Sequence, residues 1–394
     1  MVRGPALLPL VAIACVAVPE PALETREAVA LEEGGLTVHL LLSAAYEDLQ
    51  PQPDGSLDAA TRPIRGALIE VLGPGGLLLA HGALDATGTA ELTFEASPGL
   101  PLRVRVLALT AQRFLSVAVR SGSYAIHALE SPVVPADGSM VLSLLATADS
   151  AGPAFNLFDA VSAAARELAV RYGPLPGLDV VWSAGLSHPC GSCYLPFAAA
   201  ILVGGGETDP DHWDDSVVLH ELGHWFEDSL SASTSPGGAH DGTPTWPDLA
   251  WSEGFASAFG QGFLGSPVYV DSLADSAWSM DLERMGGSHA WGTEGGHLED
   301  DVSENLVAAV LWDLQDDGAE PHDALAAGLL RILDPAVAWL GREDRPDVGF
   351  PGVDLADYLT GWFTTGAGRW WEVADIVLAR DYPYPFHAPP LALP

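Results

Sequence analysis

The chain has 394 residues, and 53 Asp and Glu against 16 basic residues give it a formal net charge of -37. The basic residues are all arginines, because the sequence contains no lysine. A chain with this negative charge repels phosphate backbones and anionic lipids. The charge therefore argues against binding nucleic acid and against docking on membranes through a basic patch. Hydrophobic residues make up 48% of the chain and charged residues 18%, so we expect a globular protein.

Residues 1–19 have the pattern of an export signal. Arg3 gives a positive start, and the apolar run 6–18 is too short to span a bilayer. Cleavage after Ala17 would yield a freely secreted protein, whereas a lipoprotein-type signal would leave Cys15 as a lipidated N-terminus. We therefore expect an extracytoplasmic protein, secreted or lipid-anchored at the cell surface or periplasm, with no transmembrane helix.

The next part of the chain is predicted to form a β-sandwich. Residues 20–34 are rich in Pro, Glu and Ala and are expected to be a linker. Over residues 35–150, short apolar runs alternate with turns that contain Gly and Pro, and runs such as 36–40 and 102–106 have partial period-two alternation. This region resembles the prealbumin-like or immunoglobulin-like modules appended to secreted enzymes.

A second domain is predicted over residues 151–385, because apolar residues adopt helical spacing near residue 154. A strand is expected at 180–182, and helices are expected at 155–172, 324–333, 355–363 and 370–379. The predicted fold class is therefore α+β, with an N-terminal β-sandwich and a zincin-like domain whose C-terminal part is mainly helical.

Cys190 and Cys193 are the two cysteines that remain when Cys15 is removed or lipidated. A thiolate zinc site would need a second cysteine pair, which the sequence lacks. We expect either a structural disulfide, which an oxidising compartment would favour, or two unpaired thiols.

The segment 217–226 contains His-Glu-x-x-His within an apolar helical pattern. His220 and His224 share one helix face because they are four residues apart, so both imidazoles can bind one cation. Glu221 lies beside them and can handle a proton. Catalytic zinc takes three protein ligands, and Glu253 is the best third candidate, because a carboxylate in an apolar helix is costly without a cation.

These motifs resemble those of the gluzincin metallopeptidases, in which two histidines and a glutamate on one helix are joined by a glutamate from the next. The likeness covers roughly residues 155–380, and 252–256 is similar to the Glu-Gly-Phe-Ala of gluzincin aminopeptidases. The 28 residues between His224 and Glu253 are more like the fungalysin branch than the thermolysin branch. The run 308–314 also looks like a fungalysin helix.

The resemblance implies that His220, His224 and Glu253 bind Zn²⁺ and that Glu221 is the general base. The predicted function is an exported zinc peptidase, in which Glu221 activates a zinc-bound water for attack on a peptide carbonyl. The alternative is a non-catalytic surface or adhesion protein that uses the zincin-like part as a scaffold and the sandwich for binding. The intact Glu221 argues for the enzyme.

A residue that stabilises the oxyanion is also implied, because thermolysin and fungalysin relatives place a histidine shortly before the last helix. The corresponding position here, near Asp301, is acidic. His297 is the predicted substitute, and Tyr269 and His289 are the alternatives.

Two segments are expected to shape the cleft. The run 198–203 is the predicted edge strand that pairs with an extended substrate. The segment 231–249 is a long Gly-, Ser-, Thr- and Pro-rich loop between the two ligand helices, and it is expected either to wall the cleft or to be a flexible surface insertion.

Acidic residues concentrate around the predicted site. Residues 201–325 contain 25 Asp and Glu against a single arginine, Arg284. We therefore expect a peptide or protein substrate of basic character, whose attraction to the cleft weakens with added salt. Acidic pairs within this stretch, such as 209–211 and 214–215, are candidates for Ca²⁺ binding as well as for solvated surface.

Overall fold

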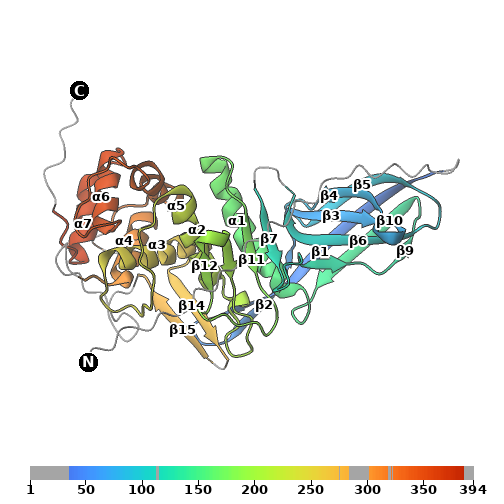
Figure 1. Ribbon diagram of the computed structural model, residues 1–394, viewed down its shortest axis with the longest axis horizontal. Helices are drawn as coiled ribbons and strands as arrows, with labels where there is room; N and C mark the ends of the chain where they lie inside the picture. The colour runs from blue at the N-terminus through green and yellow to red at the C-terminus, as the bar shows by residue number, and fades with distance from the viewer. Residues whose placement is uncertain are drawn as a thin grey trace, which may run out of the picture.

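The computed structural model describes residues 35–111, 115–274, 276–283, 301–317, 321 and 323–385. Within these ranges the chain has the expected α+β fold, with a β-rich N-terminal part at one end and mainly helical structure at the other (Figure 1). The predicted signal and linker lie outside the described residues. Across the described part of the chain, every helix is too short or too polar to cross a bilayer.

The strands of the N-terminal part are β1 (Leu36–Pro51), β2 (Leu57–Pro63), β3 (Ala67–Leu72), β4 (Leu78–Ala83), β5 (Thr89–Ala96), β6 (Pro101–Thr110), β7 (Val117–Arg120), β8 (Ala128–Glu130), β9 (Val134–Pro135) and β10 (Ser139–Ala146). The middle of the chain contains α1 (Gly152–Tyr172), β11 (Leu178–Val181), β12 (Cys193–Leu195), β13 (Ala200–Leu202), α2 (Asp215–Leu230), α3 (Pro247–Leu264), β14 (Val268–Leu273) and β15 (Ser276–Asp281). The last helices are α4 (Glu304–Gln315), α5 (Leu329–Pro335), α6 (Leu355–Thr364) and α7 (Trp370–Ala379).

Two sheets form the predicted sandwich. In one, β1 pairs with β10 in parallel and with β5 and β2 in antiparallel fashion, and in the other β3 pairs with β4 and β6. Alternate residues of β1, including Val38 and Leu40, are buried, as are Val104 and Val106 of β6. They belong to one hydrophobic core, so the period-two pattern reflects one buried face on each sheet.

The second sheet continues from the sandwich into the helical part. Its strand order is β12-β13-β11-β7-β6-β3-β4, and β11 pairs in parallel with β7, with Leu178 opposite Val117. Helix α1 contacts β1, β6 and β7 as well as α2. The domain boundary at residue 150 stays a prediction, and the backbone pairing between β7 and β11 crosses it.

The edge of this sheet is formed by β12, which is antiparallel to β13. The prediction that 198–203 forms the edge is wrong, because β13 lies between β12 and β11. Ala200 and Ile201 are buried there. Their apolar character indicated a strand correctly, but it could not distinguish a central strand from an edge strand.

Helices α2 and α3 carry the sequence motifs and pack closely because glycines lie at their contacts. A Cβ atom added to Gly223 of α2 would lie 2.7 Å from Ala256 Cα, and one added to Gly260 of α3 would lie 3.0 Å from His220 N. Larger side chains at either glycine would push the helices apart. The close contacts therefore fix how the side chains of α2 and α3 face one another.

Candidate metal centre

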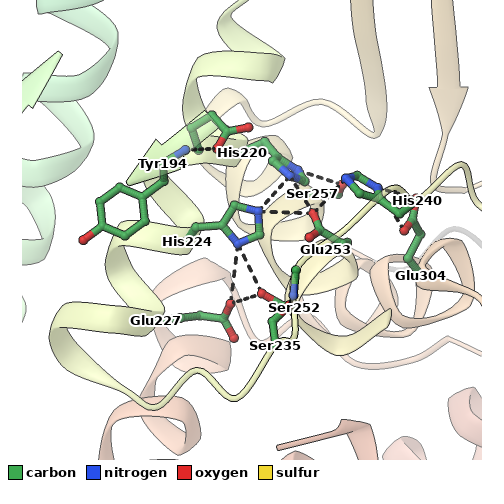
Figure 2. A network of polar contacts seen from close by, with 12 residues as sticks. Tyr194, His220, His224, Glu227, Ser235, His240, Ser252, Glu253, Ser257 and Glu304 are labelled. Atoms are coloured by element: carbon green, nitrogen blue, oxygen red, sulfur yellow. Dashed lines mark hydrogen bonds and ion pairs between the residues drawn. The ribbon is translucent and has the colours of Figure 1, made fainter. Parts of the chain in front are cut away.

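Helices α2 and α3 bring the three predicted metal ligands together (Figure 2). His220 Nε2 and His224 Nε2 are 3.1 Å apart, and each lies 3.2 Å from Glu253 Oε2. His220 and Glu253 are buried, and His224 is half-buried. The four-residue spacing on α2 and the following helix α3 therefore produce one convergent donor set.

The donor set fits a zinc ion. Tetrahedral zinc with bonds of about 2.0–2.1 Å separates its ligand atoms by roughly 3.3 Å. The separations among the three side chains are 3.1 to 3.2 Å. Two imidazole nitrogens and one carboxylate oxygen are also ligands that zinc prefers at catalytic sites. His220, His224 and Glu253 thus have the spacing and the chemistry that such an ion needs.

Serines of α3 orient the two histidines. His220 Nδ1 lies 3.1 Å from Ser257 Oγ, and His224 Nδ1 lies 3.2 Å from Ser252 Oγ. Ser252 Oγ donates to Glu227 Oε2 at 2.9 Å, so its oxygen is free to accept a hydrogen bond from the Nδ1–H of His224. This tautomer leaves the Nε2 lone pair of His224 facing the centre, which is the arrangement that a metal-bound histidine requires.

Strong electrostatic coupling links the three side chains in the absence of an ion. Burial would raise the pKa of Glu253, but hydrogen bonds and charges from His220 and His224 outweigh burial and hold that pKa below its usual range. Burial also opposes protonation of His224, but Glu227 and Glu253 outweigh it and raise the pKa of this imidazole well above 6.5. Metal binding must therefore release a proton from this centre.

Glu221 faces the edge strand of the sheet. Its Oε2 accepts a hydrogen bond of 2.7 Å from the backbone N–H of Tyr194 in β12. The phenol of Tyr194 donates to Asp228 Oδ2 at 2.8 Å. Strand β12 is thus attached to α2 at two points. The carboxylate predicted as general base therefore bonds to the sheet edge and lines the same cavity as the metal ligands.

His240 also lies at the centre, although the sequence reasoning did not select it. Its Nε2 is 3.4 Å from Glu253 Oε2, and its Nδ1 is 3.1 Å from Glu304 Oε2. Its ring is nearly parallel to that of His220, with 9° between the planes and 6.5 Å between the centroids. The hydrogen bond to Glu304 raises the pKa of His240 to about 9, so this imidazole is cationic at neutral pH.

The loop that carries His240 walls a cavity, as expected for 231–249. The cavity has a volume of about 1060 Å³ and is lined by the candidate metal ligands together with Ser233, Gly237, His240 and Asp241 of this loop. The sequence feature that could have indicated His240 is a histidine in a Gly-rich loop between the two ligand helices. Its partner Glu304 comes 64 residues later, and that pairing is visible only in three dimensions.

The three residues that the sequence offered for stabilising an oxyanion have different outcomes. His297 and His289 lie outside the described residues, so their roles stay predictions. Tyr269 of β14 does reach the cavity, where its ring meets that of His220 edge-on with 6.2 Å between centroids.

The cavity also contains a group of aspartates. Asp209, Asp211 and Asp271 each place a carboxylate oxygen within 4.8 Å of the others, and all three line the cavity. Burial, together with the nearby charges of Asp209 and Asp271, raises the pKa of Asp211 to about 8. Asp271 thus adds a third carboxylate to the acidic pair 209–211 that the sequence indicated. Hard carboxylate oxygens suit Ca²⁺, and Ca²⁺ binding here stays a prediction.

Of the two states expected for the cysteine pair, the structure contains the disulfide between Cys190 and Cys193. Both residues line the cavity that holds the candidate metal centre.

Parts of the chain are similar to known proteins. Residues 178–344 match the family model of the mycolysin C-terminal domain. The chain is also 33% identical over 116 residues to an uncharacterized protein of Archaeoglobus fulgidus, and the alignment covers 27% of this chain and 29% of that protein. The chain therefore spans less than a third of the length of this curated relative. The match to the mycolysin C-terminal domain suggests a peptidase-related protein, and both ligand helices lie within residues 178–344.

Proposed function

We propose that the protein is an exported zinc-dependent peptidase. The observation that carries this proposal is the convergence of His220, His224 and Glu253, with donor atoms 3.1 to 3.2 Å apart, inside a large cavity. The similarity of residues 178–344 to a peptidase domain supports the same reaction class. Glu221, adjacent to the ligands in sequence and bonded to the sheet edge, is the proposed general base.

Bound zinc would supply Lewis acidity, which lowers the pKa of water and polarises a substrate carbonyl. Glu221 would accept a proton from the attacking water at Oε1 and pass it to the leaving amine. The Tyr194 N–H holds the other oxygen, Oε2, at 2.7 Å. This contact orients the carboxylate before the proton moves.

The edge strand β12 is the proposed docking position for the substrate backbone. An extended peptide can add to an unpaired sheet edge through main-chain hydrogen bonds. β13 covers one side of β12, and the residues of β12 line the cavity on the other. A peptide placed there would lie next to Glu221, whose hydrogen bond from the Tyr194 N–H leaves the other main-chain groups of this edge to pair with the peptide.

His240 is the residue that we propose to stabilise the charge that develops on the carbonyl oxygen. A preorganised cation at that point lowers the barrier because the charge exists only in the transition state. Glu304 fixes Nδ1 of His240, while Nε2 lies 3.4 Å from Glu253 Oε2 and therefore close to the metal position. Tyr269 is the second candidate within the described cavity.

The proposed substrate is a basic peptide. The carboxylates of Asp209 and Asp271 line the same cavity as the ligands, and its described lining contains no arginine. Such a wall attracts ammonium and guanidinium groups and repels acidic side chains.

The proposal is tested with purified protein, one equivalent of zinc and a mixture of unstructured peptides. Wild-type protein should cleave them, and both a chelator and Glu221→Gln should abolish cleavage, whereas zinc content should persist in the variant. A wild-type protein that retains one zinc and cleaves nothing would instead favour the non-catalytic surface protein. A protein that binds no zinc, with the stability of His220→Ala unchanged by added metal, would rule out both functions.

A further inference from the structure

The Cys190–Cys193 disulfide lies next to the contact that orients the proposed base. Cys193 is the first residue of β12, and the following residue, Tyr194, donates its backbone N–H to Glu221 Oε2 at 2.7 Å. A single peptide bond therefore separates the cross-linked residue from the donor. The position of that donor depends directly on how the strand begins.

Ser192, between the two cysteines, attaches the same loop to Asp211, another residue of the cavity lining. Its hydroxyl donates to Asp211 Oδ2 and accepts the backbone N–H of Gly204 at 2.9 Å. Gly191 has a φ of +72°, a conformation that residues with a side chain rarely adopt, which lets the loop turn this tightly. The short cross-linked loop thus connects the acidic group of the cavity with the strand that contacts Glu221.

Apart from the Tyr194 phenol, which donates to Asp228 on α2, strand β12 has few other restraints among the described residues. It has three residues, and it pairs with β13 alone among the described strands. Short edge segments with few backbone hydrogen bonds are the parts of a fold that open most easily. A cross-link at the first residue of the strand limits this opening, because it restricts the conformations that the segment can adopt.

Reductants can reach the disulfide. Cys190 is exposed, and both cysteines line the cavity. A trialkylphosphine breaks the S–S bond with one water molecule: two electrons pass from phosphorus to sulfur, each sulfur gains one proton, and the phosphine becomes its oxide. A dithiol gives the same two cysteine thiols and becomes a disulfide itself.

We propose that the Cys190–Cys193 disulfide is a positioning element of the cleft, which holds the Tyr194 N–H on Glu221 and makes activity sensitive to reduction. The proposal rests on the peptidase function proposed above. In the proposed reaction, the disulfide contacts neither the metal ligands nor the reacting atoms. Its reduction should therefore change turnover and local exchange while the metal stays bound.

The experiment compares the oxidised full chain with the same chain reduced by a phosphine under native conditions. Reduction should lower kcat about tenfold, because a hydrogen bond to a charged group is weakened. The Tyr194 amide should exchange with deuterium faster, and zinc content should stay at one equivalent. Reoxidation should restore the original kcat and the original exchange rate. Cys190→Ser/Cys193→Ser is the matched control, which should have the reduced protein's kcat and should not respond to the phosphine.

Amide exchange provides a readout that does not depend on peptidase activity. Unchanged exchange at Tyr194 after complete reduction overturns the proposal, as does faster exchange with unchanged kcat. Loss of zinc on reduction also overturns it, because the disulfide would then support the metal site itself. If the oxidised protein cleaves no peptide, the peptidase function fails, and the exchange of Tyr194 still decides whether the disulfide holds this contact.

Discussion

His240 lies against Glu253, with 3.4 Å between its Nε2 and the Oε2 of the glutamate, although one residue comes from a loop and the other from α3. Glu304 of α4 holds the other nitrogen of the same ring. The imidazole is therefore fixed between a proposed metal ligand and a second carboxylate. This arrangement places a cation beside the metal position without adding it to the convergent donor set.

Replacing His240 with alanine should lower kcat about 100-fold, because a preorganised donor to the developing oxyanion is lost. Zinc content should be unchanged, because His220, His224 and Glu253 remain. Steady-state kinetics and metal analysis on the same samples measure both quantities.

The matched control is His81→Ala, which removes an exposed histidine of β4 and should leave kcat unchanged. His297→Ala separates the two assignments. If His297→Ala loses activity while His240→Ala retains it, the oxyanion role belongs to His297.

Ser252→Ala should weaken zinc binding about 10- to 100-fold, the usual cost of losing a hydrogen bond that orients a metal-bound histidine. The serine accepts from His224 Nδ1 and donates to Glu227, so its removal frees the imidazole to rotate and leaves a buried carboxylate without that donor. Competition with a chromophoric chelator gives the Kd. Ser276→Ala, on the exposed start of β15, should leave the Kd unchanged.

The sequence predicted the centre as far as local periodicity could. His220 and His224 converge because four residues complete about one helical turn, and Glu253 was predictable because it is the one carboxylate in the otherwise apolar stretch 251–259. His240 and Asp271 have no such local signature. They reach the cavity through a loop path and a β-hairpin, so their positions depend on tertiary packing alone.

The sheet shows the same limit. The apolar run that contains β13 was recognisable as a strand, whereas β12 has only three residues and lies beside a disulfide loop. Which of the two strands forms the edge depends on their pairing partners. β13 pairs with β11 as well as with β12, so β12 forms the edge. Strand order is a long-range property that the pattern of apolar residues does not encode.

Asp271→Asn should reduce kcat/KM for Lys- or Arg-containing peptides about three- to fivefold and leave neutral peptides nearly unaffected, because a partly exposed charge pair contributes ~1 kcal/mol or less. Added salt should narrow the difference between wild type and variant. Asp375→Asn, on the exposed face of α7, changes the net charge equally and is the control. Equal losses in both variants would mean that total charge, rather than this wall of the cavity, attracts the substrate.

Asp214 should make the folded state less stable as pH rises. This residue is 1% exposed, its Oδ2 accepts two hydrogen bonds from Ser272, and its Oδ1 has no hydrogen-bond partner among the described residues. Burial, aided by the charges of Asp271 and Asp209 against the Ser272 hydrogen bonds, raises its pKa from 3.8 to about 7. The folded protein therefore keeps a proton at Asp214 that the unfolded chain has already released.

Between about pH 4 and pH 7 the folded state binds more protons at this residue, so the free energy of unfolding falls as pH rises. Asp214→Asn removes this pH-dependent contribution to stability. The oxygen of the new amide can still accept the hydrogen bonds from Ser272. Measured by urea unfolding, the stability of the variant relative to wild type should increase by roughly 2–4 kcal/mol from pH 4.5 to pH 8. Asp375→Asn should show no such trend. A constant difference between Asp214→Asn and wild type over this range would mean that Asp214 is ionised throughout.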